Sequence, residues 1–307
     1  MRILVGGASG LVGGALLPRL KAAGHEIVRL TRGSGGEGGT GAAGAGIVSW
    51  DPDRGILEPS LLRGFDSVVH LGGASIASGR WSAKRKQLIL ESRTRSTLLL
   101  AERLAALPAD ARPRVFVVAS ATGYYGNRGD ALLDETSGPG EGFLADVCRA
   151  WEEAAWPASR AGVRVVQPRI GVVLARDGGA LAAMLLPFRF GLGGPIGGGR
   201  QWWPWISLHD LVRVFERALS DESLSGPVNA VAPEAATCGD VARALGRALH
   251  RPAILPVPAF AIRLLLGEMA DALLLASAKV APARLARGGF VFELPTLDAA
   301  MTAALAG

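Results

Sequence analysis

The stretch VGGASGLVGG, residues 5–14, decides the fold that this sequence predicts. It follows a short apolar run at residues 2–6 and opens a helical pattern at 11–24, the context that gives a glycine motif its meaning. Gly7 permits a tight turn, Gly10 lets the backbone approach a pyrophosphate, and Gly13 allows close helix packing. The start of the helix offers free N–H groups to phosphates. The stretch therefore predicts a dinucleotide site formed by Gly7, Ser9, Gly10, Leu11, Val12 and Gly13.

Apolar runs and helical patterns alternate through the first two thirds of the chain. Helical patterns, each ending near Gly or Pro, lie at 11–24, 82–107 and 143–162. Alternation of this kind predicts an α/β fold with a Rossmann-type, doubly wound parallel sheet. Its strands would be the runs rich in Val and Ile, typical of burial on both faces, at 2–6, 26–31, 67–73, 114–120 and 163–174.

The pattern loosens after about residue 171, and the last third of the chain is mainly helical. We predict a Rossmann domain over 1–170, to which 205–230 return. A smaller, mainly helical C-terminal lobe would comprise 171–204 and 231–307. The glycine-dominated insert at 33–46 is predicted to form a mobile surface loop, because it offers little apolar surface to bury.

Composition excludes several classes of protein. The chain has 307 residues, of which 49% are hydrophobic and 20% charged, so it is expected to be globular. The net charge is +6, but the one basic concentration, at 80–95, lacks the aromatic residues of a base-stacking surface, and no nucleic-acid partner is expected. Cys148 and Cys238 lie far apart outside any CxxC pattern, so neither a disulfide nor a metal site is expected.

The most apolar C-terminal stretch, FAIRLLLGEMADALLLAS at 260–277, is interrupted by Arg263, Glu268 and Asp271. Charges are costly in the middle of a bilayer, so the stretch is predicted to be a buried helix pair, and no membrane partner is expected. The apolar run before Gly6 is too short for the core of a signal peptide. A cytoplasmic location is therefore the default expectation.

The end of the second predicted strand bears on which dinucleotide would bind. Thr31 and Arg32 stand there, and the next carboxylate is Glu37 inside the insert. NAD enzymes usually place Asp or Glu at this point, whereas an arginine accommodates a 2′-phosphate. NADP(H) is therefore the predicted cofactor. The alternative is that Arg32 packs over an adenine ring or points to solvent.

Several longer motifs carry a resemblance that covers essentially the whole chain. They are VVHLGGASI at 68–76, SATGYYGNRGD at 120–130, FLADVCRAWE at 143–152, GGALAAMLLPFRFGLGGPIGGGRQWWPWISLHDLV at 178–212 and KVAPARLARGGFVFELPTLDAAM at 279–301. With these the chain resembles the extended short-chain dehydrogenases/reductases. More narrowly, it resembles the epimerase-family branch with a DUF1731-type C-terminal domain, some of whose members are named for a link to cell division.

The resemblance implies further cofactor contacts. Leu71, Gly72 and Gly73 would line the adenosine and diphosphate together with Ala119, and Arg93 would point its guanidinium toward the cofactor. Pro168 and Arg169 would lie beside the nicotinamide. The first position of the family's glycine motif is often threonine but is Gly6 here.

The proton-transfer residues of the superfamily are missing. In that superfamily a tyrosine, followed four residues later by a lysine that lowers its pKa, exchanges a proton with the substrate hydroxyl. Those two places fall on Phe143 and Val147. The family's serine falls on Ser120 or Ala121, depending on whether Tyr124 or Tyr125 matches the family tyrosine.

Substitute proton donors are few. Tyr124 and Tyr125 are the only tyrosines, and both lie in the loop expected to face the nicotinamide. Ser120 and Tyr124 are therefore the candidate catalytic residues, and ring packing under the loop is the alternative for the tyrosines. Among the remaining titratable groups, the expectations are a core position for His70 and a helix cap for His209. Asp146 and Glu152 are expected to face solvent or to cap charges.

Two interpretations remain open for the run WWPW at 202–205, which would either wall a substrate pocket or cement the two lobes. The sequence predicts an NADP-dependent oxidoreductase or epimerase acting on a small hydroxyl or carbonyl substrate of unknown identity. The competing hypothesis is a weakly active or inactive cofactor sensor that acts through a protein partner. A homodimer is also compatible with the sequence.

Overall fold

The computed structural model describes residues 1–33 and 46–306, so the predicted insert at 33–46 lies almost entirely outside the described residues. A parallel sheet forms the centre, in the order β11-β8-β5-β4-β1-β2-β3, with β6 also paired to β8. These strands are β1 (Arg2–Gly6), β2 (Glu26–Arg32), β3 (Ile47–Trp50), β4 (Ser67–His70), β5 (Val115–Val118), β6 (Ser120–Ala121), β8 (Arg164–Ile170) and β11 (Gly226–Ala230). The predicted Rossmann-type fold is confirmed.

The strand order reverses beside β1. The chain passes from β1 outward through β2 and β3, then crosses to β4 on the other side of β1. Gly6, the last residue of β1, is in register with Leu30 of β2 and His70 of β4. Ligands of doubly wound sheets bind in the crevice outside the carboxyl ends of the strands at such a reversal.

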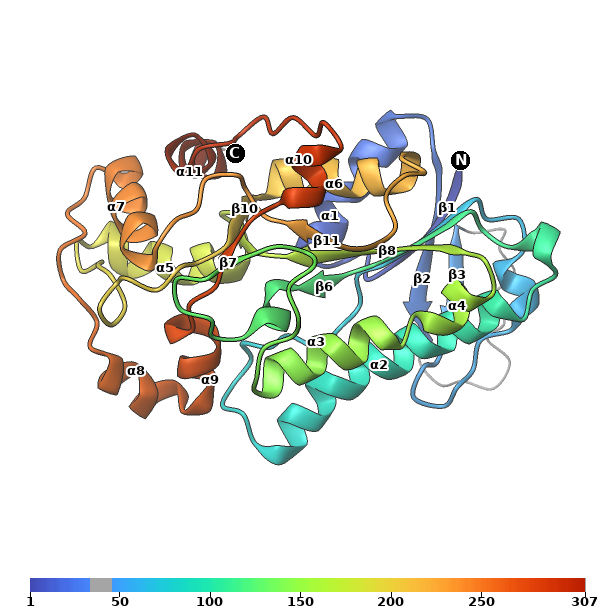
Figure 1. Ribbon diagram of the computed structural model, residues 1–307, viewed down its shortest axis with the longest axis horizontal. Coiled ribbons are helices and arrows are strands. Elements are labelled where there is room, and N and C mark those ends of the chain that lie inside the picture. Colours follow the sequence, from blue (N-terminus) through green and yellow to red (C-terminus); the bar gives the residue numbers. More distant parts are fainter. Residues whose placement is uncertain (34–45, 307) are drawn as a thin grey trace.

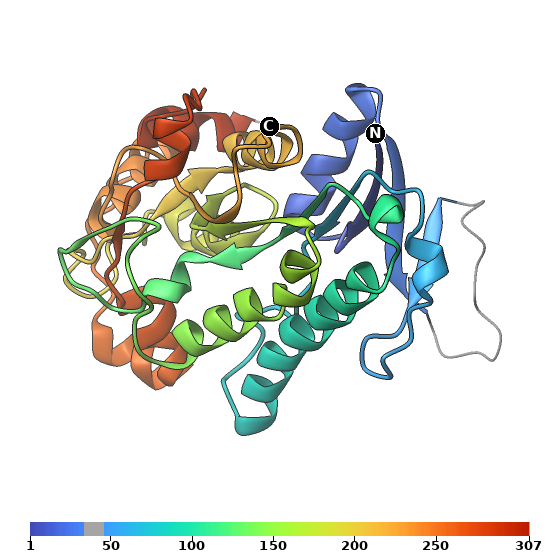
Figure 2. The ribbon, with the colours of Figure 1, turned by 45° about the vertical axis from the view of Figure 1, so that its right-hand side comes forward.

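Helices cover both faces of this sheet. One face carries α1 (Leu11–Ala22) and α6 (Leu208–Ser220), and the other carries α2 (Ala83–Ala105), α3 (Phe143–Glu153) and α4 (Trp156–Arg160) (Figure 1). Figure 2 shows α2 and α3 running side by side beneath the sheet. Successive strand residues enter opposite cores, because side chains alternate across a strand: Val68 of β4 packs on the α2 side and Val69 on the α1 side.

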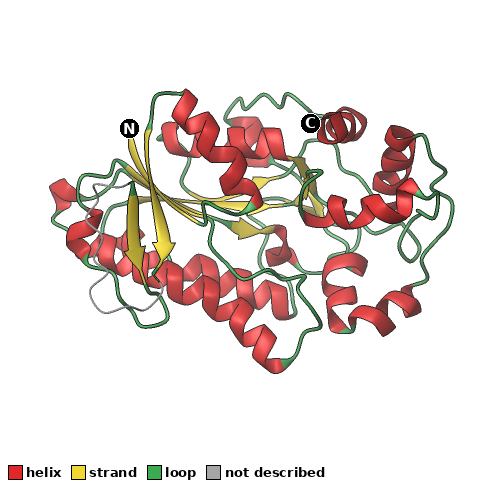
Figure 3. Cartoon of the chain, turned by 180° about the vertical axis from the view of Figure 1, so that it is seen from behind, coloured by secondary structure: helices red, strands yellow, loops and turns green. Residues whose placement is uncertain are grey.

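The C-terminal part of the chain is built around a third core. There α5 (Gly179–Arg189), α7 (Cys238–Leu249) and α11 (Leu297–Ala306) pack with the buried Trp203 and Trp205. Figure 3 shows this helical end of the molecule opposite the strands nearest the N-terminus. Two small sheets join it to the rest of the chain, formed by β9 (Val172–Leu174) with β10 (Trp205–Ser207) and by β7 (Leu132–Leu133) with β12 (Lys279–Val280).

The remaining elements are short. They are α8 (Ala259–Leu266), α9 (Glu268–Ala270), the π-helical turn η5 (Asp271–Leu275), α10 (Ala283–Arg287) and the 3-10 turns η2 (Pro59–Leu62), η3 (Ala109–Ala111) and η4 (Thr122–Tyr125).

Local contacts explain where the elements depart from the predicted ones. The expected strand at 163–174 is two strands, which are separated at Gly171. The backbone of Gly171 passes close to Pro204, whose carbonyl oxygen would lie 2.6 Å from a Cβ at position 171. The expected helix at 143–162 is interrupted before Pro157, which cannot donate the hydrogen bond of a continuous helix. His209 is not the cap of α6; Ser207 is, accepting a hydrogen bond from the Asp210 amide.

The prediction of a buried helix pair at 260–277 is wrong for its first helix. None of the α8 residues is buried, and Phe260 and Leu264 are 73% and 78% exposed. Met269 and Ala270 of the following α9 are buried. Among the residues that the structure describes, no helix is both long and apolar enough to cross a bilayer.

Candidate functional site

The glycine turn between β1 and α1 is a close contact between two backbone segments. Gly7 has φ of +78°, a conformation that side chains disfavour, and a Cβ there would lie 2.7 Å from the carbonyl carbon of Leu71. A Cβ at Gly13 would lie 2.5 Å from the Gly7 carbonyl oxygen. Gly10 caps α1 without any side-chain hydrogen bond, and no acidic residue occupies the first turn. The first amides of α1 are therefore available to an anion.

The second wall of this crevice follows β4. The Leu71 amide donates to the Gly6 carbonyl at 2.9 Å, and the Ala119 amide donates to the His70 carbonyl at 3.0 Å. These bonds bring the predicted contacts Leu71 and Ala119 to the same edge of the sheet as the glycine turn. The two glycines that follow Leu71 continue the wall, since a Cβ at Gly73 would lie 3.0 Å from the Arg93 guanidinium carbon.

Arg93 projects from α2 toward this wall. Its guanidinium carbon lies 5.1 Å from the centre of the Trp151 ring, and its Nη1 donates to the Ile89 carbonyl at 3.0 Å. Burial lowers the pKa of this guanidinium below its ordinary value. The hydrogen bond to Ile89 goes to a carbonyl oxygen and does not neutralise the guanidinium. Arg93 therefore holds a partly buried positive charge beside Gly73.

His70 occupies the space beneath both backbone walls. A Cβ at Gly6 would lie 2.8 Å from its Nδ1, and one at Gly72 would lie 2.7 Å from its Cε1. Nε2 lies 2.9 Å from the Ser96 hydroxyl, whereas Nδ1 has no hydrogen-bond partner among the described residues. Burial, assisted by the charge of Arg32, lowers the pKa of His70 to about 4. The imidazole is therefore a neutral core residue, and its Nδ1 occupies space that a threonine side chain at position 6 would need.

The end of β2 lies on the other side of β1. Arg32 is its last residue and is exposed, and Thr31 before it is half-buried. Arg32 is in register with Trp50 of β3. Its guanidinium thus stands at the carboxyl edge, where a ribose bound over the glycine turn would reach.

A buried charged network begins at Ser120, immediately beyond β5. The Ser120 hydroxyl donates to Glu152 Oε1 at 2.7 Å, and the Arg169 guanidinium donates to both Glu152 oxygens at 2.8 Å. The exposed fractions of the two charged side chains are 3% for Arg169 and 11% for Glu152. Burial works to lower the pKa of Arg169, but hydrogen bonds and charge from Glu152 outweigh it and raise the pKa. The expectation that Glu152 faces solvent is wrong, although Asp146 on the same helix does.

The sequence carried a signal for this pair that the predictions missed. Arg169 lies within an apolar strand, and a charge inside such a strand requires a buried partner of opposite sign. Glu152 sits on the face of α3 that carries Val147 and Trp151 toward the core. The network then extends to Gln167, whose side-chain amide donates to the Glu152 carbonyl at 2.8 Å.

The two tyrosines of η4 have different surroundings. Tyr125 is fully buried; its hydroxyl accepts from Arg169 Nη1 at 3.0 Å and donates to Asn229 Oδ1 at 2.7 Å. Burial raises the pKa of Tyr125 above its ordinary value. Tyr124 is only half-buried, and its ring centre lies 3.4 Å from the Arg169 guanidinium carbon. Within the described ranges, no residue hydrogen-bonds to the Tyr124 hydroxyl, so it is the one of the two that can meet a substrate.

The start of α3 carries the two positions where the superfamily has its tyrosine and lysine. Val147 is a core residue, 3% exposed. Phe143 is half-buried, with the Trp81 ring 5.0 Å away and the Lys86 ammonium 5.1 Å from its ring centre. Lys86 is in turn paired with Glu268 of α9 at 2.5 Å. At these two positions the helix therefore places Val147 in the core and the half-buried ring of Phe143 against Trp81 and Lys86.

The tryptophans at 202–205 have structural contacts with several parts of the chain. Trp203 and Trp205 are buried in the third core, and the space beside them measures about 10 Å³, far below the size of a ligand pocket. Trp202 donates its indole N–H to Asp130 at 2.7 Å, and the Lys279 ammonium lies 4.4 Å from its ring. The prediction of a tryptophan-lined cleft is not supported by these positions.

The residues of the crevice fit a dinucleotide. Glycines stand wherever a Cβ would block the approach of backbone to backbone, helix amides point outward at the turn, and arginines lie on both sides at Arg32 and Arg93. Pro168 and Arg169 of β8 lie at the same edge, since Arg169 is in register with Ser120. Both cysteines are buried, and burial raises the pKa of Cys148 to about 12, which disfavours the thiolate form that a nucleophile needs.

A doubly wound parallel sheet with a glycine turn at its strand-order reversal and a helical C-terminal part defines an extended short-chain dehydrogenase/reductase. The chain belongs to the NAD dependent epimerase/dehydratase family, whose sequence model matches residues 3–230. Residues 257–304 match a second family, described as a domain of unknown function, DUF1731.

Two of the similar proteins have nearly the same length as this chain, and a third is longer. The epimerase family protein ML0860 of Mycobacterium leprae is 41% identical over 300 residues, covering 98% of this chain and 94% of that protein. A crystal structure of human epimerase family protein SDR39U1 with NADPH is 36% identical, with a TM-score of 0.88 and 99% coverage of both chains. A nucleoside-diphosphate sugar epimerase from Corynebacterium glutamicum is 35% identical with a TM-score of 0.78, covering 99% of this chain and 58% of that one.

Proposed function

We propose that this protein is an NADP(H)-dependent oxidoreductase or epimerase that acts on a small hydroxyl or carbonyl compound. The observation that carries the proposal is the glycine crevice, with Arg32 exposed at the end of β2 where an NAD enzyme would place a carboxylate. The similar human protein crystallised with NADPH supports the choice of the phosphorylated cofactor.

In this proposal each wall of the crevice holds one part of the cofactor. Backbone amides from Gly7 to Gly13 would bind the diphosphate and Arg32 the 2′-phosphate, while Leu71 to Gly73 and Ala119 would line the adenosine side. Arg93 would add positive charge near Gly73. When bound, a nicotinamide dinucleotide supplies or accepts the hydride.

Tyr124 is the proposed proton partner of the substrate oxygen. Its hydroxyl is available, and Arg169 holds a permanent cation 3.4 Å from the ring centre. In the superfamily that positive charge comes from a lysine four residues beyond the tyrosine, a place that Val147 occupies here. The geometry favours a supporting role for Ser120, whose hydroxyl donates to Glu152 and thereby holds the carboxylate that orients Arg169.

The cofactor part of the proposal is tested by titrating the purified protein with NADPH and with NADH while following cofactor fluorescence. Arg32→Glu should weaken NADPH binding by about tenfold to a hundredfold, because a charge-assisted contact to the 2′-phosphate would become repulsive. Arg29→Glu is the matched control, since Arg29 is exposed on the same strand. If Arg32→Glu leaves the preference for NADPH unchanged, the assignment of the 2′-phosphate is wrong.

The catalytic part is tested with a panel of sugars, aldehydes and ketones. We expect either substrate-dependent oxidation of NADPH, for an oxidoreductase, or conversion of a sugar into its epimer without net oxidation of the cofactor, for an epimerase. Tyr124→Phe should abolish either reaction while NADPH binding stays normal. The second candidate function, a cofactor sensor acting through a protein partner, is favoured by the absence of the tyrosine and lysine at Phe143 and Val147. Tight NADPH binding without turnover of any compound in the panel would support the sensor.

A further inference from the structure

The helical end of the molecule exposes an unusual number of large apolar side chains. Of the fifteen that are exposed in the described residues, eight lie in two short segments, 186–192 and 254–265. Their exposed fractions run from 47% to 78%. These eight residues form the apolar end of the molecule. They are Leu186, Phe190, Leu192, Ile254, Leu255, Phe260, Leu264 and Leu265. Exposed patches of this kind mark sites of contact with a protein or a membrane.

Backbone hydrogen bonds hold the two segments side by side. The Leu255 amide donates to the Gly193 carbonyl at 3.2 Å, and the Val257 amide donates to the Pro195 carbonyl at 2.9 Å. Helix α8 begins two residues after Val257, and Phe260 and Leu264 lie one turn apart on it. Figure 1 shows these elements at the end of the molecule remote from β1, β2 and β3. The apolar end is therefore separate from the glycine crevice.

The two sequence stretches that form the apolar end carry positive charge only. Residues 178–209 and 241–267 contain no Asp or Glu, although the whole chain has 27 such residues. The same two stretches contain six arginines, which are Arg189, Arg200, Arg243, Arg247, Arg251 and Arg263. Three of these arginines pair with carboxylates from outside the two stretches: Arg243 with Asp240, Arg247 with Asp298 and Arg263 with Asp271. A surface that combines exposed leucine and phenylalanine with arginines that outnumber their carboxylate partners complements an apolar layer with an anionic face.

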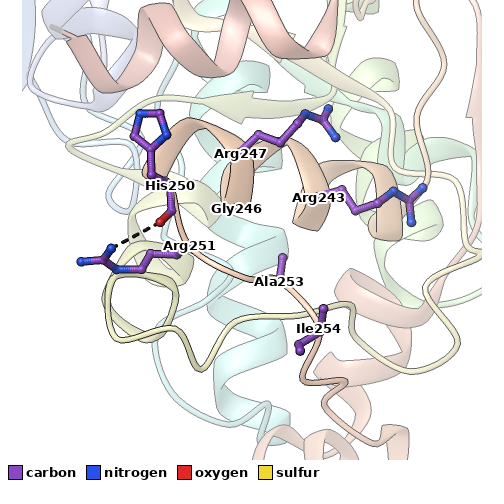
Figure 4. A pocket seen from close by; sticks show the side chains of 7 residues that line it. All are labelled: Arg243, Gly246, Arg247, His250, Arg251, Ala253 and Ile254. Carbon is purple, nitrogen blue, oxygen red and sulfur yellow. Dashed lines mark hydrogen bonds between the residues drawn. The ribbon is translucent and has the colours of Figure 1, made fainter.

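An open hollow beside Ile254 gathers several of these arginines. It measures about 520 Å³ and is lined by Arg243, Arg247, His250 and Arg251. Figure 4 shows His250 and Arg251 on one side of the hollow, Arg243 and Arg247 on the other, and Ile254 at its edge. Arg243 pairs with Asp240 and Arg247 with Asp298, but both pairs are exposed. Exposed pairs of this kind contribute little, so these guanidinium groups can exchange a carboxylate for a phosphate.

We propose that the apolar end docks on the surface of an anionic lipid bilayer. Phe260, Leu264 and Ile254 would enter the boundary between headgroups and acyl chains, and Arg247 and Arg251 would bind lipid phosphates. Helix α8 carries exposed Phe260, Leu264 and Leu265 together with Arg263, the combination of apolar and basic residues found in helices that lie in the membrane interface. The charges in 260–277 argue against a span, but they do not hinder a helix that lies flat on the surface.

Charge favours this occupant over a second copy of the chain. A twofold contact would place the same patch against itself and bring arginines from both copies together. A bilayer containing phosphatidylglycerol carries negative charge, and its fluid surface does not require a protein of complementary shape. The docking proposal is independent of the proposed catalytic function, because the residues that carry it lie outside the glycine crevice.

Vesicle flotation tests the proposal with the full chain. The probes are vesicles of equal parts phosphatidylglycerol and phosphatidylcholine, and vesicles of phosphatidylcholine alone. We expect binding to the anionic vesicles that falls as salt is added, and at least tenfold weaker binding to the neutral ones. Equal binding to both vesicles, or binding to neither, overturns the proposal.

Paired variants locate the contact. Phe260→Ser combined with Leu264→Ser should weaken vesicle binding by at least about tenfold, and Arg247→Glu combined with Arg251→Glu should do the same. The controls are Leu88→Ser, an apolar residue of α2 that is 46% exposed, and Lys84→Glu on the same helix. Circular dichroism and NADPH titration check that each variant folds. Equal effects of the test and control variants overturn the proposal, as does a sedimenting dimer that Phe260→Ser dissociates without any vesicle binding.

Discussion

The guanidinium carbon of Arg169 lies 3.4 Å from the centre of the Tyr124 ring, while the same group donates to both oxygens of Glu152 at 2.8 Å and to the Tyr125 hydroxyl at 3.0 Å. The N–H edge of the planar group is therefore fixed within the core, while the ring of the candidate catalytic residue lies against one of its faces. A cation held by a buried carboxylate cannot follow the ring if the ring moves. The position of Tyr124 thus depends on Glu152 through Arg169.

This dependence predicts the effect of removing the carboxylate. Glu152→Gln should lower the free energy of unfolding by about 3–5 kcal/mol, because it leaves the Arg169 charge buried without its counterion. Urea unfolding followed by circular dichroism measures the loss. The matched control is Asp146→Asn on the same helix, whose exposed pair with Arg149 should contribute less than about 1 kcal/mol. A similar small effect for both variants would contradict the assignment of a buried pair.

The two adjacent tyrosines should separate stability from activity. Tyr125→Phe removes a buried hydroxyl that Arg169 and Asn229 both contact, and it should lower the free energy of unfolding by about 1–3 kcal/mol. Tyr124→Phe should leave thermal unfolding nearly unchanged and abolish turnover under the proposed function. The comparison needs only thermal melts and the carbonyl panel. Unaltered stability of Tyr125→Phe would mean that its hydroxyl is not part of the buried network.

Much of the sheet could be predicted because a strand buried on both faces is visible as a continuous apolar run. Val68, Val69 and their neighbours in β4 show this pattern, and the glycine turn fixes which end of the sheet holds the site. The strand β3 was not predicted, because it follows the insert at 33–46 and has only four residues. The exposed surface of α8 was not predicted either, since hydropathy alone does not distinguish an apolar helix in a core from one on a surface.

The candidate site shows a similar division. Residues whose role is backbone geometry, such as Gly7 and Gly13, can be found from spacing, since the contact they permit is local in the sequence. The Glu152–Arg169 pair joins residues 17 positions apart on a helix and a strand, and nothing local specifies the contact. Tyr124 and Tyr125 are neighbours in the sequence, yet one is half-buried and the other fully buried. The difference depends on the direction that each side chain takes from η4, which the sequence does not specify.

Two glycines of α1's N-terminal region provide a test of the crevice. Gly7→Ala should abolish NADPH binding, because its φ of +78° and the Leu71 carbonyl carbon 2.7 Å from the new Cβ force the turn to rearrange. Gly14→Ala is the matched control: apart from its chain neighbours and its own helix backbone, no described atom would lie within 4 Å of the new Cβ, so NADPH binding should persist. Alanine also favours helix over glycine, and the control should gain about 0.5–1 kcal/mol of stability. Cofactor fluorescence and thermal melts report both outcomes, and normal binding by Gly7→Ala would remove the crevice as the cofactor site.

His70 should make the stability of the protein depend on pH between about 6.5 and 4. Its pKa is near 6.5 in the unfolded chain and about 4 in the folded one, because burial and the charge of Arg32 oppose protonation. Between these values the unfolded chain binds a proton that the folded chain does not. The contribution of neutral His70 is therefore complete above pH 6.5 and is lost as the pH falls to 4, by about 3 kcal/mol in total.

Replacing the imidazole by a group that does not titrate isolates this effect. His70→Gln should be less stable at neutral pH but should show a flat unfolding free energy across the window in which the wild type declines. Both proteins should lose stability at lower pH, where hydrogen bonds from Thr136 and Ser223 hold the pKa values of Asp134 and Asp221 below their usual range. Urea titrations at a series of pH values measure both curves. A decline of equal size in wild type and variant between pH 6.5 and 4 would show that His70 is already protonated in the folded protein, and that its buried Nδ1 has a partner.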